Sequence, residues 1–178
     1  MKNLLFVIIA LGIIINPDTS FAQEPLKLRP SPLELVTMMY EDTYVKITYC
    51  RPSKKGRDIF GGLEPYGKVW RTGANEATEI TITGDIKIGN HELKAGTYSI
   101  FTIPEEKEWT IIINSDLGQW GAFTYNAEHD VLRFNVKTEK TDQVYEPFTI
   151  EFEQNGTQKT NLLMIWDRTR VTIPIEFL

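Results

Sequence analysis

The residues best suited to bind a ligand gather in one stretch of the chain, residues 51–79. Within it, the run RTGAN at residues 71–75 places a guanidinium, a hydroxyl, an unhindered backbone and a carboxamide close together, with Arg71 at its start and Asn75 at its end. Such a run can bind an anion through backbone N–H groups, with the arginine as a bidentate clamp. Three further cations of the stretch would add to this site if the loop folds back on itself: Arg51, Lys55 and Arg57.

Aromatic and acidic side chains extend the candidate site. Tyr66, Trp70 and, further along the chain, Trp120 could offer a stacking surface for a sugar or an apolar group. Glu76 and Glu79 are the carboxylates nearest the cationic loop. In a hydrolase, Glu76 would be the leading acid or base, which requires a second carboxylate about 5 to 9.5 Å away.

The same residues also fit a purely structural loop. Arg71 could pair with Glu76 or Glu79, while Trp70 and Phe60 close the end of the fold. The glycines of the loop would then only make turns. Both interpretations stay open at the level of sequence.

Other reactive side chains fit structural roles. His91 lies beside a Gly-Asn turn, and His129 lies between Glu128 and Asp130, where a carboxylate favours the charged imidazole. Cys50 ends a predicted strand with no histidine nearby, which favours a small semi-buried residue over a reactive thiol. As the single cysteine it excludes an intramolecular disulfide.

Metal-binding patterns are missing from the sequence. There is no HxH, HExxH or cysteine pair of the kind that binds zinc. Residues 114–118, NSDLG, lack the regular oxygen ligands of a calcium loop. We therefore predict no metal and no cofactor.

Alternating apolar and polar residues predict an all-β fold. No segment has a convincing helical period, and Asn155-Gly156 is a strong signal for a hairpin turn. We expect nine or ten short strands arranged as an antiparallel β-sandwich of two sheets, with residues 51–79 as one long ordered loop. The predicted strands cover residues 33–40, 44–50, 79–83, 86–88, 96–103, 109–114, 131–138, 148–153, 159–166 and 170–177.

The first residues have the pattern of a signal peptide. Lys2 precedes an apolar run of 12 residues, 4–15, which is too short to span a bilayer, and Ser20-Phe21-Ala22 suits signal peptidase. We expect a signal peptide at residues 1–22, a flexible proline-containing leader at residues 23–32 and a single domain at residues 33–178. The protein is then exported, to the periplasm or beyond, with no membrane span after cleavage.

The charge of the chain limits its partners. A formal net charge of −5 argues against a general binder of nucleic acid or of anionic membranes. Residues 51–79 oppose this trend, with six cations and four acids. A small anionic or carbohydrate ligand is therefore the partner we expect, and the oligomeric state is left open.

Several motifs resemble a known family. They are RPSxKGRxIFGGLxPYGxxWRTGANEAT at residues 51–78, LKAGTYSIFTIP at 93–104, QWGAFxY at 119–125, DVLR at 130–133 and WxxTRV at 166–171. Together they resemble the domain of unknown function 2911, a family of secreted bacterial proteins. The resemblance implies a secreted, mostly β, single domain, and it brings no activity and no catalytic residue. Cys50 stands where this family more often has serine, which further weakens a thiol mechanism.

Three functions remain open from sequence. The first is a module that binds a small anionic or carbohydrate ligand, and it requires Arg71 and Trp70 to be accessible. The second is a hydrolase of envelope polymers that uses Glu76. The third is a structural or protein-interaction domain in which the loop only closes the fold.

Overall fold

The computed structural model describes residues 28–178, so the expected signal peptide and the first half of the expected leader, residues 23–27, lie outside the described residues. The described chain forms nine strands and one short 3-10 helix, η1 (Ala127–His129). The strands are β1 (Leu33–Tyr40), β2 (Thr43–Cys50), β3 (Thr78–Ile82), β4 (Ile86–Ile88), β5 (His91–Leu93), β6 (Gly96–Pro104), β7 (Glu108–Asn114), β8 (Asp130–Gln154) and β9 (Lys159–Phe177). The all-β prediction is confirmed.

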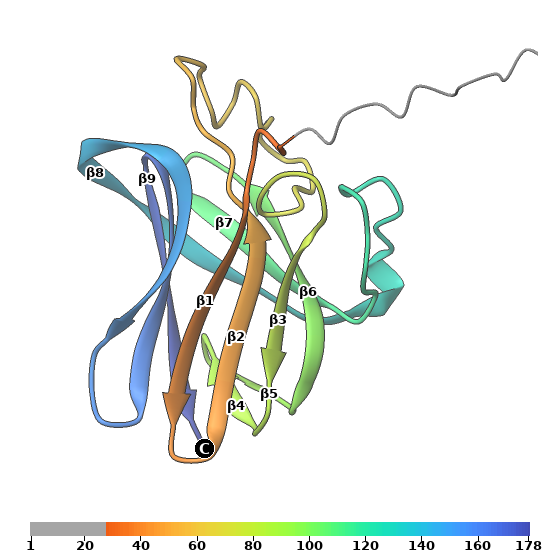
Figure 1. Cartoon of the computed structure of the whole chain (residues 1–178), viewed down its shortest axis with the longest axis vertical. Helices are drawn as coiled ribbons and strands as arrows, with labels where there is room; N and C mark the ends of the chain where they lie inside the picture. Colours follow the sequence, from red (N-terminus) through yellow and green to blue (C-terminus); the bar gives the residue numbers. More distant parts are fainter. Residues whose placement is uncertain (1–27) are drawn as a thin grey trace, which may run out of the picture.

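All nine strands belong to one antiparallel sheet in the order β1-β2-β3-β6-β7-β8-β9-β4-β5 (Figure 1). The predicted hairpin of residues 33–40 with 44–50 is confirmed, with Leu33 opposite Cys50. The predicted pairing of residues 96–103 with 109–114 is confirmed as well. Among residues 28–178, no helix is long and apolar enough to cross a membrane.

The expected division into two separate sheets is not what the structure shows. Residues 131–138 and 148–153, predicted as two strands, are parts of the single long strand β8, and residues 159–166 and 170–177 are both parts of β9. The first part of β8 pairs with β7 and its later part pairs with β9, which makes the sheet continuous. Register shifts around Tyr145 interrupt the β8–β9 ladder, and such irregularities bend a strand without ending it.

The core lies between the two halves of this bent sheet. Buried side chains from β2, β3, β6 and β7 meet those from β4, β8 and β9 in one cluster, which includes Ile47, Ile80, Ile150 and Trp166. The inward positions of β2 and β3 alternate with half-buried ones, as expected for strands that have one face on a core. The arrangement therefore resembles a sandwich in its packing while remaining one hydrogen-bonded sheet.

The loop between β2 and β3 is anchored to the core by Trp70. Its backbone exchanges two hydrogen bonds with Thr102 of β6, at 2.7 and 2.9 Å. Its indole stacks on Trp166 at 5.9 Å between ring centroids and contacts Phe148 edge-on at 5.0 Å. Phe60 from the same loop packs edge-on against Trp70 and Trp109. Aromatic pairs of this kind add to the free energy of simple burial, so the loop is part of the core rather than an appendage.

We predict that Trp70→Ala lowers the free energy of unfolding by about 3 to 5 kcal/mol, because it opens a cavity among aromatic rings. The variant also removes the indole donor of the Gly73 carbonyl, at 3.0 Å. Urea unfolding followed by circular dichroism measures the loss. The matched control is Trp120→Ala, whose side chain is 58% exposed against 3% for Trp70 and which should change stability by no more than about 0.5 kcal/mol. Equal losses in the two variants would contradict the anchoring role of Trp70.

Candidate functional site

A groove opens at the point where β2 and β3 separate. Residues 45–48 of β2 pair with residues 79–82 of β3, and just before β3 the chain at Ala77 pairs with a different segment. Ala77 donates its N–H to the Gln119 carbonyl at 2.9 Å, so it pairs with the loop that follows β7 instead. The resulting groove has a volume of about 310 Å³, at the lower end of the range for small-ligand sites. Its walls are Leu33, Thr48, Tyr49, Cys50, Glu76, Ala77, Glu79 and Gly118.

Glu76 forms the polar end of this groove. Arg29 donates from Nη1 to both carboxylate oxygens, at 2.7 and 2.8 Å. The Cys50 thiol donates to Oε2 of Glu76 at 3.3 Å. Burial alone would raise the pKa of Glu76, but the hydrogen bonds from Arg29 and Cys50 lower the pKa below its ordinary value. Glu76 is therefore ionised, which suits a carboxylate that holds a cation or a hydroxyl better than one that donates a proton.

Glu79 lies on the outer face of the sheet and forms a second acidic wall. It stands opposite Thr48 of β2 and Ser99 of β6. One carboxylate oxygen accepts the Gly118 N–H at 2.8 Å, which ties the loop after β7 to the sheet. The groove thus contains two carboxylates, and none of its wall residues is a lysine or arginine.

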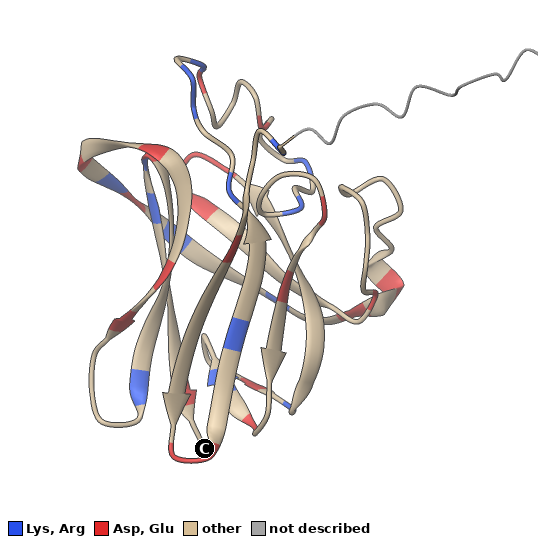
Figure 2. Cartoon of the chain, in the orientation of Figure 1, with Lys and Arg blue, Asp and Glu red and all other residues tan. Residues whose placement is uncertain are grey.

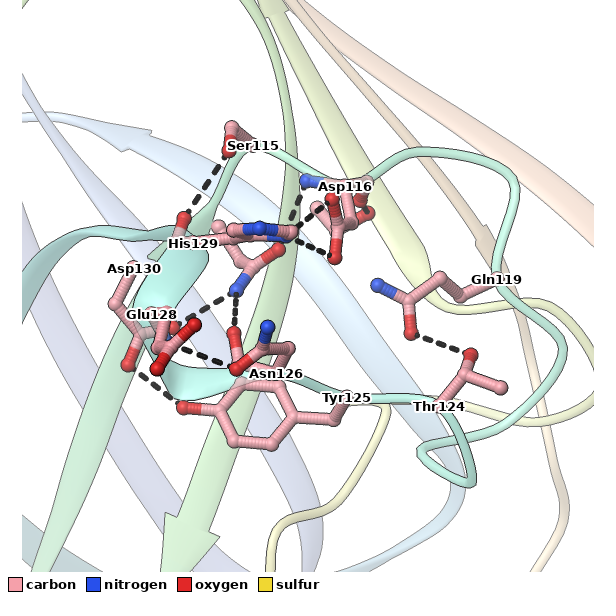
Figure 3. Close-up of polar contacts among 11 residues, drawn as sticks. Ser115, Asp116, Gln119, Thr124, Tyr125, Asn126, Glu128, His129 and Asp130 are labelled. Atoms are coloured by element: carbon pink, nitrogen blue, oxygen red, sulfur yellow. Dashed lines mark hydrogen bonds and ion pairs between the residues drawn. The ribbon is translucent and has the colours of Figure 1, made fainter.

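The loop between β7 and η1 completes the groove and is held by a polar network (Figure 3). Asn114 donates to the Asn126 carbonyl at 3.0 Å and to the Asp130 carboxylate at 2.9 Å. The Tyr125 hydroxyl donates to the same carboxylate at 2.6 Å, and His129 contacts Asp116 at 2.7 Å. These contacts fix both ends of the loop, so Gly118 is held at the groove.

Trp120 stands opposite Glu76, one of the wall residues of the groove. The two residues form an antiparallel bridge, and side chains directly opposite in such a pair lie on the same face. The indole is 58% exposed. Ala122 and Tyr125 of the same loop pack on Phe101, so the loop is anchored while Trp120 stays open to solvent. An accessible aromatic ring can stack on the apolar face of a sugar ring, and an ionised carboxylate beside it can accept hydrogen bonds from the hydroxyl groups of the sugar.

The cations predicted to converge on an anion are instead spread along the loop (Figure 2). Arg51 donates to Thr149 of β8 at 3.2 Å and lies 3.8 Å from Glu34 of β1. Arg57 donates to backbone carbonyls of its own loop, at 2.7 and 2.9 Å. Lys55 is exposed, and its backbone N–H donates to Glu146 at 2.7 Å. The structure therefore does not bring Arg51, Lys55 and Arg57 together at one site.

Arg71 and Asn75 also have local roles. The Asn75 amide donates to the Ser31 carbonyl at 3.3 Å, and its backbone has a positive φ of 58°, a conformation that asparagine tolerates. Arg71 is half-buried, and its Nε has no hydrogen-bond partner among the described residues. It forms no ion pair with Glu76 or Glu79 in the described structure. The Ala74 N–H in the middle of the RTGAN run donates to the Cys50 carbonyl at 3.1 Å, so this N–H is not available to an anion.

The predicted aromatic surface is only partly available. Trp70 is 3% exposed, so its proposed role as a stacking surface is wrong and its alternative role in closing the fold is the one observed. Tyr66 is partly exposed but stands against Gly61, where an added Cβ would lie 2.7 Å from its ring. Of the three predicted aromatics, Trp120 is the one that is open and next to the groove.

Sequence reasoning missed Arg29 and gave Cys50 no place in the site. Arg29 falls in the segment expected to be a flexible leader, and 47 residues separate it from Glu76. No local pattern reports a contact of that separation. The position of Cys50 at the end of β2, next to the long loop, was the one available signal that it would lie near the loop residues. Within residues 28–178, no group of three or more His, Cys, Asp or Glu side chains is arranged to hold a metal ion.

Comparison with known proteins gives one match. The family model described as "Protein of unknown function (DUF2911)" matches residues 31–175. No curated protein and no solved structure matches the chain. The match covers β1 to β9 and therefore the whole groove, but it carries no ligand or activity.

We predict a pH-dependent cost of stability at Glu64, close to Arg71. Burial raises the pKa of Glu64 from 4.5 to about 7, and the charges of Arg71 and Arg57 offset part of this effect. Because the folded protein then binds this proton more tightly than the unfolded chain, the free energy of unfolding falls as pH rises between 4.5 and 7. Glu64→Gln should therefore gain more stability over the wild type above pH 7 than below pH 4.5, as measured by urea unfolding.

A direct titration checks the same assignment. Carbon-13 NMR of the Glu64 carboxyl should give a midpoint that rises further in Arg71→Gln, because the favourable charge of Arg71 is gone. An unchanged midpoint would show that Arg71 does not act on Glu64.

We predict a second pH effect in the loop after β7. The hydrogen bond and the charge of Asp116 raise the pKa of His129 above its ordinary value of 6.5. The Asp116–His129 contact therefore stabilises the fold fully below pH 6.5 and loses this contribution as pH rises through the higher folded value. In Asp116→Asn, the titration midpoint of the His129 imidazole, measured by proton NMR, should move to lower pH. The Ser115 amide donates to the His129 carbonyl at 3.0 Å, and its hydrogen should exchange with solvent faster at low pH in this variant than in the wild type. A variant with the wild-type midpoint would refute the pairing.

Proposed function

This chain belongs to the DUF2911 family, whose description names no activity, and we propose from the geometry of the groove that it is an exported domain that binds a small carbohydrate. The observation that carries this proposal is the exposed side chain of Trp120 directly opposite Glu76, which lines a groove with a second carboxylate, Glu79. Carboxylates accept hydrogen bonds from sugar hydroxyls, and an indole stacks on the apolar face of a sugar ring.

The electrostatics of the groove favour a carbohydrate over an anion. Both charged side chains of its wall are acidic, and Arg51 of the neighbouring loop is engaged with Thr149 and Glu34. An anionic ligand would meet like charge at Glu76 and Glu79, which costs binding free energy in a partly buried site. A neutral polyhydroxylated ligand does not pay this cost.

The state of Glu76 favours binding over hydrolysis. Its pKa is lowered by hydrogen bonds from Arg29 and Cys50, against the effect of burial. A general acid needs a raised pKa to keep its proton near neutral pH. Support for export comes from the amino-terminal sequence alone, where a lysine, a 12-residue apolar run and small residues before position 23 follow the pattern of a signal peptide.

A thermal-shift screen of mono- and disaccharides tests the proposal. We predict that a sugar at one hundred times its dissociation constant adds about 2.7 kcal/mol to the free energy of unfolding, which corresponds to roughly 5 to 10 °C in Tm for a domain of this size. Trp120→Ala should weaken binding by about 0.5 to 1.5 kcal/mol, up to about tenfold in Kd, and Glu79→Gln should weaken it as well.

The control is Glu92→Gln, an exposed carboxylate of β5 at the opposite edge of the sheet from β1. It should bind the same sugars with unchanged affinity. A screen in which phosphates or carboxylates stabilise the protein and no sugar does would overturn the proposal, and so would a sugar whose affinity is the same in Trp120→Ala as in the wild type.

A further inference from the structure

The groove already holds a cation supplied by the chain itself. Arg29 precedes β1 and reaches Glu76, where Nη1 lies 2.7 and 2.8 Å from the two carboxylate oxygens. The same nitrogen lies 3.9 Å from the sulfur of Cys50. The guanidinium is thus seated at the polar end of the groove, in contact with two of its wall residues.

This contact is poorly suited to hold the fold together. The side chain of Arg29 is 52% exposed and that of Glu76 is 39% exposed, and ion pairs this open to solvent contribute little to stability. Arg29 comes from the short segment before β1 and not from a strand of the sheet. A ligand can therefore displace it without disturbing the core.

No wall residue of the groove supplies a positive charge in place of Arg29 when Arg29 leaves. Glu76 would then keep one partner, the Cys50 thiol, as a neutral hydrogen-bond donor. The other acidic wall residue, Glu79, also accepts from a neutral donor, the backbone N–H of Gly118. The remaining walls contain no lysine, arginine or histidine. A carboxylate forms stronger hydrogen bonds with a charged donor than with a neutral one, so the ligand that replaces Arg29 most favourably is itself a cation.

We propose that the sugar bound in this groove is an amino sugar, whose ammonium group replaces the Arg29 guanidinium on Glu76 while its ring stacks on Trp120. The inference rests on the carbohydrate-binding function proposed above and specifies the class of sugar. It also makes Arg29 a competitor built into the chain, because ligand and Arg29 use the same carboxylate. Removing such a competitor multiplies the measured Kd by the fraction of molecules whose site is free of it, so a competitor that occupies half of the sites costs about twofold in affinity.

Three disaccharides with the same linkage separate the contribution of the sugar rings from that of the positive charge. They differ in one substituent on each ring, which is a hydroxyl in cellobiose, an ammonium in its diamino analogue and an acetamide in its diacetyl analogue. Isothermal titration calorimetry on the full mature chain should show the diamino sugar binding about tenfold more tightly than cellobiose, the gain expected of a hydrogen bond between charged groups. The diacetyl sugar, which has no charge, should not share this gain.

Variants of the ion pair test the assignment to Glu76. Arg29→Ala should bind the diamino sugar about two- to fivefold more tightly than the wild type, as expected for loss of a weak competing ion pair. Glu76→Gln should lose the preference for the diamino sugar over cellobiose, and Glu92→Gln should keep it. Circular dichroism confirms that each variant is folded, and the Arg29→Ala result stands independently should Glu76→Gln fail to fold.

The outcomes separate this inference from the proposed function. If all three sugars bind equally, carbohydrate binding stands and the assignment of an amino sugar is overturned. The inference is also overturned if Glu76→Gln keeps the preference for the diamino sugar, or if Arg29→Ala binds this sugar no more tightly than the wild type. Either result would show that the ammonium group does not bind to Glu76 in place of Arg29. If none of the three binds and no other sugar stabilises the protein, the proposed function fails with it.

Discussion

The packing of Trp70 into the core is the constraint on which the candidate site depends. The backbone of Trp70 fixes the loop after β2 against β6 through two hydrogen bonds with Thr102. Its indole stacks on Trp166 of β9, so Trp70 joins the two halves of the bent sheet. The short segment from Trp70 to β3 then has little freedom. Gly73 passes so close to β2 that an added Cβ would lie 3.0 Å from the Cys50 carbonyl. This path brings Glu76 to the groove, so the structural role of the loop is also what positions this carboxylate.

The alternation of apolar and polar residues in the sequence predicted the positions of the strands well, but it did not predict how the strands join into one sheet. Alternation located the hairpin of β1 with β2 and the pair of β6 with β7, because each strand has one face on the core and successive side chains point to opposite faces. It divided β8 and β9 into shorter strands, since the bend near Tyr145 interrupts the alternation without ending the hydrogen-bonded ladder. Whether two halves of a sandwich are separate sheets or one continuous sheet is decided by such bends, and periodicity does not report them.

For the candidate site too, the sequence predicted the segment that contributes to it but not the contacts between distant segments. Residues 51–79 were predicted to carry the site, and they supply Glu76 and Glu79 to the groove. The predicted cluster of cations assumed that neighbours in sequence are neighbours in space, whereas Arg51 and Arg57 have separate hydrogen-bond partners. A loop made of successive tight turns, with positive φ at Lys55, Thr72 and Asn75, sends adjacent side chains in different directions. The partners that define the groove chemically, Arg29 and Gly118, come from distant parts of the chain, and only the fold brings them to Glu76 and Glu79.

The position of Arg29 has a practical consequence for handling this protein. The segment that precedes β1 ends at the groove, whereas the carboxyl terminus lies at the other end of the molecule, where the Leu178 N–H is 3.4 Å from the Asp85 carbonyl (Figure 1). An affinity tag fused directly ahead of residue 28 would lie close to the contact of Arg29 with Glu76, and a cationic tag there could take the place of Arg29 on this carboxylate. A tag placed after Leu178 would lie far from this contact, so the carboxyl terminus is the better place for a tag.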